Sequence, residues 1–96
     1  MRFEWDEAKN RSNLRKHGVS FAEVCRLFES GVEYLEIYDA EHSKVEERFI
    51  AIGPIERGVV VVVFTELEEA AVRVLGARFA TRRERDRYRM HMDRLP

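Results

Sequence analysis

The stretch Val59-Val60-Val61-Val62-Val63-Phe64 is the longest apolar run in the chain, and it decides the fold. Branched and aromatic residues of this kind favour extended structure. The run is far shorter than the roughly 20 residues that a membrane helix needs. A strand that is apolar on both faces must be covered on both faces. We therefore expect a central β-strand covered by other elements or by a second copy of the chain.

Three further segments alternate with the period of a strand, at residues 32–38, 48–55 and 71–78. The connection Glu56-Arg57-Gly58 has the length and the glycine of a hairpin. Short connections make neighbouring strands antiparallel. The segment 2–5 is predicted to add a short strand at the start of the chain.

Helix signals flank this run of strands. Asp6 is the expected N-cap of a helix that ends at His17. Capping boxes at residues 20–23 and 81–84 begin a second helix and a last helix that runs to about Arg94. The predicted order is β-α-α-β-β-β-β-α, an α+β fold with two N-terminal helices and a C-terminal helix packed on a mainly antiparallel sheet.

Length and composition predict one intracellular domain spanning residues 1–96. The single cysteine, Cys25, excludes an internal disulfide and fits a reducing cytoplasm. The first residues lack the apolar segment of a secretory signal. We therefore expect a cytoplasmic location and no membrane partner.

Positive charge is concentrated near the end of the chain, although the formal net charge is only -1. Residues 78–94 hold seven arginines and three acids, whereas residues 32–77 hold four basic and ten acidic side chains. Binding to phosphates follows the local field and the number of neutralised phosphates. Nucleic acid is therefore the first partner to test.

The faces of the last helix differ in their charge. Tyr88, Met92 and Leu95 are expected to dock on the body, and Asp86 is placed to pair with Arg89. Three arginines on another line are predicted to be unpaired: Arg83, Arg87 and Arg94. This stripe is either a solvated face or a track for RNA phosphates or an acidic partner.

Five motifs resemble, in the right order, those of the BrnT family of toxins. They are Phe3-Glu4-Trp5-Asp6-x-x-Lys9, Asn13-Leu14-x-Lys16-His17-Gly18-Val19-x-Phe21, His42-Ser43 with Glu46-Glu47-Arg48-Phe49-x-Ala51-x-Gly53, Val63-Phe64-Thr65-Glu66, and Arg73-x-x-x-Ala77-Arg78-x-Ala80-Thr81-x-x-Glu84-x-x-x-Tyr88. The resemblance implies a RelE-like fold and a metal-independent ribonuclease that halts growth by cutting RNA. It also implies neutralisation by a BrnA-type antitoxin with a ribbon-helix-helix DNA-binding domain, and a toxin homodimer within a heterotetramer.

Two positions depart from the family pattern. Gly76 stands where members often have a serine, and Phe79 stands where they often have a basic residue or proline. The family as we know it has no single agreed catalytic residue. The site is therefore assigned from chemistry.

Metal-free RNA cleavage needs a cation beside the phosphoryl oxygens, and arginine suits this task because its fork binds phosphate bidentately. Arg48 and Arg78 are the catalytic candidates, because each lies at the edge of an apolar strand. The alternative for both is a structural ion pair with Glu46, Glu47 or Glu66.

Proton transfer has its own candidates. His17 closes a helix, where the dipole favours a protonated ring that can serve as an acid or simply as a cap. Glu66 is a candidate base or partner of an arginine, and Tyr88 is either an acid or a core residue. Lys16 is a weaker proton-transfer candidate that is also expected to bind RNA, and His42 is a weak one in a polar loop.

Two other functions stay open. A divalent metal nuclease could use Asp39, Glu41 and His42, although no metal-binding spacing accompanies them. A non-catalytic module could bind RNA or a protein through the arginine helix. We expect the toxin, with no metal and no cofactor.

Overall fold

The computed structural model describes residues 1–68 and 70–96. The elements, in chain order, are β1 (Arg2–Glu4), α1 (Glu7–His17), α2 (Phe21–Glu29), β2 (Leu35–Tyr38), a 3-10 turn (Ala40–His42), β3 (Phe49–Ile55), β4 (Gly58–Leu67), β5 (Ala71–Phe79) and α3 (Arg82–Asp93). This order confirms the predicted succession of strands and helices. None of the described helices is long and apolar enough to cross a membrane.

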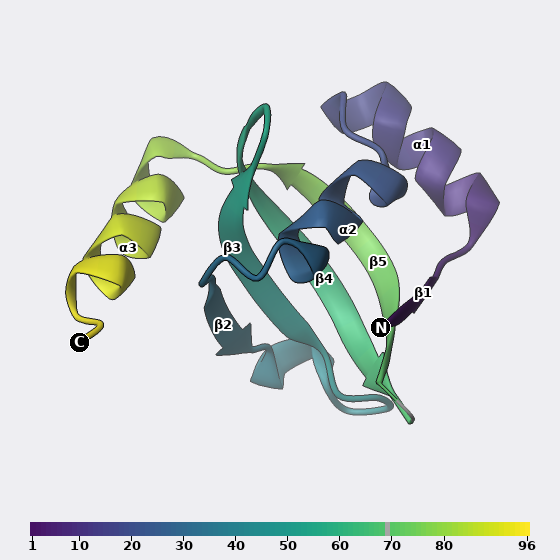
Figure 1. Cartoon of the computed structure of the whole chain (residues 1–96). Helices are drawn as coiled ribbons and strands as arrows, with labels where there is room; N and C mark the ends of the chain where they lie inside the picture. Colours follow the sequence, from purple (N-terminus) through teal and green to yellow (C-terminus); the bar gives the residue numbers. More distant parts are fainter. Residues whose placement is uncertain (69) are drawn as a thin grey trace.

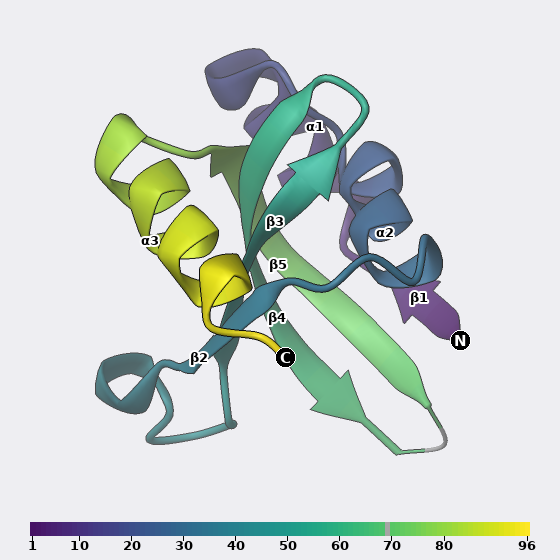
Figure 2. The same cartoon turned by 60° about the vertical axis from the view of Figure 1, so that its left-hand side comes forward.

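The strands form one sheet in the order β1-β5-β4-β3-β2, so the valine-rich β4 is central, as predicted. Every pairing is antiparallel except that of β1, which runs parallel to β5. Helices α1 and α2 cover one face of the sheet, and α3 lies over the other (Figures 1 and 2). The fold is α+β, as expected.

The helices begin where their caps predict. Asp6 accepts a hydrogen bond from the backbone of Lys9, and Ser20 accepts one from the backbone of Glu23. The Glu23 carboxylate forms an ion pair with Arg57 in the β3–β4 turn, with Nη2 and Oε1 at 2.7 Å. The capping box at residues 81–84 is complete, with both reciprocal hydrogen bonds present.

One predicted strand boundary and the predicted docking of Leu95 on the body were wrong. The strand predicted for residues 32–38 begins only at Leu35. The carbonyl of Glu33 accepts a hydrogen bond from the Tyr88 hydroxyl at 3.1 Å, so this segment anchors α3 rather than extending the strand. Leu95 lies beyond the end of α3 and is 38% exposed, whereas Tyr88 packs on the sheet as expected.

The main core lies between the sheet and α1 and α2. Phe21 and Leu27 from α2 are fully buried, and they share one apolar cluster with Phe64 on β4. The approach of α2 is close at Gly53, where an added Cβ would stand 2.6 Å from Leu27 Cδ1 and 2.7 Å from Tyr34 Cβ. This face is therefore packed without spare room.

A β-bulge in β5 decides which side chains reach the opposite face. Val63 pairs with Gly76 and Phe64 pairs with Val74, which leaves Leu75 as the extra residue. Val74 and Ala77 both belong to the main core, although strict alternation would place them on opposite faces. The bulge shifts the alternation by one residue. Arg78 consequently points to the face that carries α3.

Candidate active site

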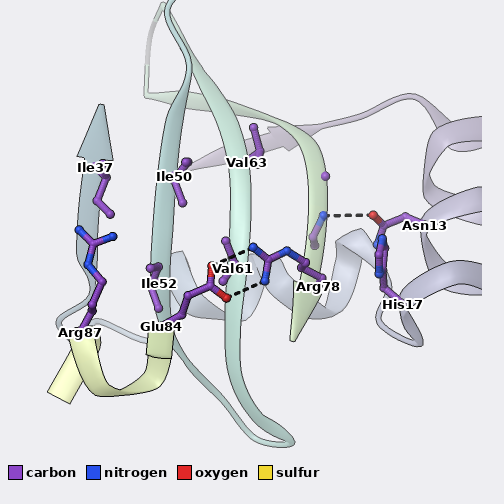
Figure 3. Close-up of a pocket in the computed structure, with 12 residues that line it drawn as sticks. Asn13, His17, Ile37, Ile50, Ile52, Val61, Val63, Arg78, Glu84 and Arg87 are labelled. Carbon is purple, nitrogen blue, oxygen red and sulfur yellow. Dashed lines mark hydrogen bonds and ion pairs between the residues drawn. The ribbon is translucent and has the colours of Figure 1, made fainter. Parts of the chain in front are cut away.

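A cleft of about 310 Å³ remains open on the α3 face, because α3 covers only part of the sheet. Its floor consists of apolar side chains from three strands, namely Ile37, Ile50, Ile52, Val61 and Val63. Its polar residues come from α1, β5 and α3, as Figure 3 shows: Asn13, His17, Arg78, Glu84 and Arg87. Elements far apart in the sequence therefore build one site.

Arg78 forms the most strongly held contact in the cleft. Its Nη1 donates to Glu84 Oε1 at 2.7 Å and its Nη2 donates to Glu84 Oε2 at 2.8 Å (Figure 3). This hydrogen-bonded pair lowers the pKa of Glu84 to about 2 and raises the pKa of Arg78. The predicted ion-pair partners of Arg78 were Glu46, Glu47 and Glu66, so the prediction missed the acid that pairs with it.

The C-terminal end of α1 forms one wall. Asn13 accepts a hydrogen bond from the backbone of Ala77 at 3.1 Å and donates one to the carbonyl of Val19 at 3.1 Å. These contacts fix α1 beside β5, close to Arg78. His17, the last residue of α1, is exposed and lines the cleft beside Asn13 (Figure 3). The only titratable ring in the lining of the cleft therefore lies on the same open face as the arginine.

The first turns of α3 form the opposite wall, which carries part of the arginine stripe. Arg87 lines the cleft, Arg83 is exposed on the same helix, and Arg94 is exposed directly after the last residue of that helix. Asp86 pairs with Arg89 at 2.9 Å, as predicted. Among the described residues, no ion pair involves Arg83, Arg87 or Arg94.

Other predicted site residues lie elsewhere. Arg48 lines a separate hollow and stands 3.8 Å from Glu46, a distance at the limit of an ion pair. Glu66 is exposed on β4. The pKa of Glu36 is raised mainly by burial, and the negative charge of Glu66 raises it further. Tyr88 is held by its contact with Glu33, and burial raises its pKa. Lys16 is exposed near the end of α1.

The loop that carries the alternative metal ligands Asp39, Glu41 and His42 forms a contact between two of its own side chains. His42 Nδ1 and Asp39 Oδ2 lie 2.9 Å apart, and His42 lines the hollow beside Arg48. Within residues 1–68 and 70–96, no three His, Cys, Asp or Glu side chains gather in a way that could hold a metal ion.

Sequence reasoning missed two residues of the cleft. Glu84 was assigned only to the capping box and a family motif, and Asn13 only to a motif. The signal for Glu84 was its position in the first turn of α3, six residues after Arg78. A strand that ends just before a capped helix brings such a pair together across the turn.

Comparisons with known proteins identify the family. The chain is similar to the ribonuclease toxin BrnT of Brucella abortus, known from a crystal structure at 1.1 Å resolution, with a TM-score of 0.64 and 28% identity. The match covers 85% of this chain and 99% of that one. A search of curated protein sequences finds no match. Residues 5–84 match the family described as "Ribonuclease toxin, BrnT, of type II toxin-antitoxin system". The chain therefore belongs to the BrnT family of ribonuclease toxins.

Proposed function

We propose that this protein is a metal-independent endoribonuclease in which the 2'-hydroxyl of RNA attacks the adjacent phosphate. The observation that carries the proposal is the shared cleft of Arg78 and His17, which combines a fixed cation with an imidazole, a side chain that can serve in general acid–base catalysis. The family's description as a ribonuclease toxin supports the substrate class.

Arg78 is assigned the role of stabilising the negative charge that develops on the phosphoryl oxygens, because a preorganised guanidinium stabilises that charge without moving. His17 is assigned proton donation to the leaving 5'-oxygen as the P–O5' bond breaks, and the proton of the attacking 2'-hydroxyl passes to solvent in the open cleft. The hydroxyl of Tyr88 is engaged by a backbone carbonyl, and Glu66 stands apart from the cleft, which makes both weaker candidates for this step. Arg48 lies in a separate hollow and is assigned to binding rather than chemistry.

The apolar floor fits RNA bases better than it fits phosphates. Ile37, Ile50 and Val63 offer surface for base stacking or packing, but they offer no hydrogen-bonding groups that distinguish one base from another. Arg87 at the edge of this floor, with Arg83 and Arg94, supplies a track for the RNA backbone. We infer backbone recognition with modest base preference, to which exposed Lys16 contributes.

A partner follows from the family, because type II systems contain an antitoxin. We propose a BrnA-like antitoxin with a ribbon-helix-helix DNA-binding domain, acting in the cytoplasm on a toxin dimer within a heterotetramer. The unpaired arginines of α3 are the expected dock for an acidic segment of that antitoxin. Inhibition is then achieved by occupying the phosphate track.

The test is RNA cleavage by purified, antitoxin-free protein in the presence and absence of a chelator. We expect chelator-resistant cleavage, products that end in a 2',3'-cyclic phosphate or 3'-phosphate, and no cleavage of DNA of the same sequence. A substrate with one 2'-deoxy position should resist cleavage at that position only.

Each other outcome would overturn the proposal in a distinct way. Chelator-sensitive cleavage with 3'-hydroxyl ends would identify a metal nuclease. Tight binding without cleavage, in protein whose fold is confirmed by circular dichroism, would identify a non-catalytic binding module.

A further inference from the structure

We propose that Glu84 is a positioning residue that holds Arg78 in the orientation needed for phosphoryl stabilisation. The inference rests on the proposed function of Arg78. Neither the sequence motifs nor the family description assigns Glu84 a role beyond its place in the capping box.

Glu84 is itself immobilised by the first turn of α3. Its Oε1 accepts a hydrogen bond from the backbone of Thr81 at 2.9 Å, and its backbone N–H donates to the Thr81 hydroxyl at 3.2 Å. The Glu84 side chain is only 21% exposed. Because the carboxylate is fixed to the start of the helix, it also restricts the motion of the guanidinium that it binds.

The contact with Arg78 leaves part of the guanidinium free. Glu84 occupies the edge formed by Nη1 and Nη2, and the second Nη1 hydrogen faces the carbonyl of Phe79 at 3.4 Å. The edge formed by Nε and Nη2 remains, and the Arg78 side chain is 41% exposed. That edge is the second bidentate face of the fork and matches two phosphoryl oxygens. One carboxylate and one phosphate can therefore share the guanidinium.

The carboxylate has two opposing effects on RNA. It fixes the rotamers of a long side chain before substrate arrives, which favours the transition state because the charge needs no reorganisation. It also places a negative charge beside the phosphate site, which weakens ground-state binding. A positioning role therefore predicts that its removal lowers kcat and does not raise KM.

The experiment compares Glu84→Gln with Thr81→Ala in steady-state cleavage of a short RNA. Glutamine keeps the size of the side chain and one acceptor oxygen, but it loses the charge and the second acceptor for Arg78. Thr81→Ala removes the other half of the same capping box and leaves the Arg78–Glu84 pair in place. Both variants weaken the start of α3, so thermal unfolding of each gives the matched control for folding.

We expect Glu84→Gln to lower kcat by roughly 10- to 100-fold, the scale on which misplacing a reacting group costs rate, with KM unchanged or lower. Thr81→Ala should keep kcat within about two-fold at a temperature where both variants are folded. Equal losses of kcat in the two variants would reduce Glu84 to a helix cap. Loss of the acidic limb of the pH–rate profile in Glu84→Gln would make it the proton acceptor and overturn the positioning role.

Arg78→Lys separates this inference from the proposed function. If Arg78→Lys retains full activity, a guanidinium in this orientation is not needed, and the assignment of Arg78 fails together with that of Glu84. If Arg78→Lys is impaired and Glu84→Gln is not, only the positioning role is overturned. When both variants are impaired, adding Glu84→Gln to Arg78→Lys should lower kcat by a smaller factor than Glu84→Gln does in the wild type, because the positioned group is already altered.

Discussion

The two faces of the sheet in this protein are built for different purposes. The face under α1 and α2 is filled by Phe21, Leu27 and Phe64, all fully buried. The face under α3 leaves Ile37 and Val63 lining an open cleft beside charged side chains (Figure 3). The difference shows that one face holds the chain folded, and the other is free to carry a site at little cost to stability.

The same division explains where charge is tolerated. On the covered face of the described chain, every residue of the buried core is apolar. On the open face, a bidentate ion pair lies over Val61 (Figure 3), where solvent still reaches the guanidinium. The following variants test whether the faces can be altered independently, from the largest expected effect to the smallest.

Arg78→Ala should lower RNA cleavage by roughly 100-fold or more, because it removes a preorganised charge from the open face. The matched control is Arg73→Ala, which removes an arginine of the same strand that pairs with Glu4 at 2.8 Å, away from the cleft. We expect near-normal cleavage in the control and two similar unfolding curves. Equal activity of the two variants would contradict a catalytic role for the open face.

Gly53→Ala and Gly76→Ala test the packing of the two faces with the same added methyl group. At Gly53 the new Cβ meets Leu27 and Tyr34, and overpacking of this kind costs about 1–3 kcal/mol. At Gly76 no atom lies within 4 Å of the added Cβ. We expect urea denaturation to show a loss of stability for the first variant and almost none for the second. Similar losses would mean that the cleft is closed in solution.

Replacing Arg83, Arg87 and Arg94 by glutamine should change binding more than chemistry. Each phosphate released contributes about -0.7 to the slope of log K against log salt for single strands, so the slope should flatten by up to about two units. RNA affinity across a salt series gives this slope, and the affinity for the antitoxin is measured in parallel. An unchanged slope together with unchanged antitoxin affinity would make the stripe a solvated surface.

Acid should weaken the Arg78–Glu84 ion pair on the open face. The contact with Arg78 lowers the pKa of Glu84 from 4.5 to about 2, so its stabilisation is present above pH 4.5 and is lost as the pH falls towards 2. Solvent screening limits the loss to the order of 1 kcal/mol. The stability difference between wild type and Glu84→Gln should therefore shrink over this range in urea denaturation. A difference independent of pH would show that the pair contributes no charge-dependent stability.

The element order, the central β4 and the helix caps followed from the sequence, because each depends on local patterns. The apolar run 59–64 identified the central strand, and the capping boxes marked the helix starts. The parallel pairing of β1 with β5 was not predicted, since it joins residues such as Glu4 and Arg73 that are far apart in the chain.

The candidate site was predictable only in its chemistry. Arg78, His17 and Arg87 were chosen for their side chains, and they line one cleft. Arg48 and Glu66 were chosen on the same grounds and lie elsewhere, because position along a strand does not reveal which strands end together. Whether the chosen residues act on RNA stays a prediction.

The bulge at Leu75 gives β5 one residue more than strict alternation places between the core residues Val74 and Ala77. In genetic terms, that codon can be lost without changing which way the strand faces. In-frame loss of Leu75 would leave Val74 and Ala77 two residues apart, so strict alternation would keep both on the core face and Arg78 on the open face. A deletion scan of the gene should therefore find that loss of Leu75 keeps toxicity, whereas loss of Arg73, which makes the core residues Val72 and Val74 direct neighbours on opposite faces, abolishes it.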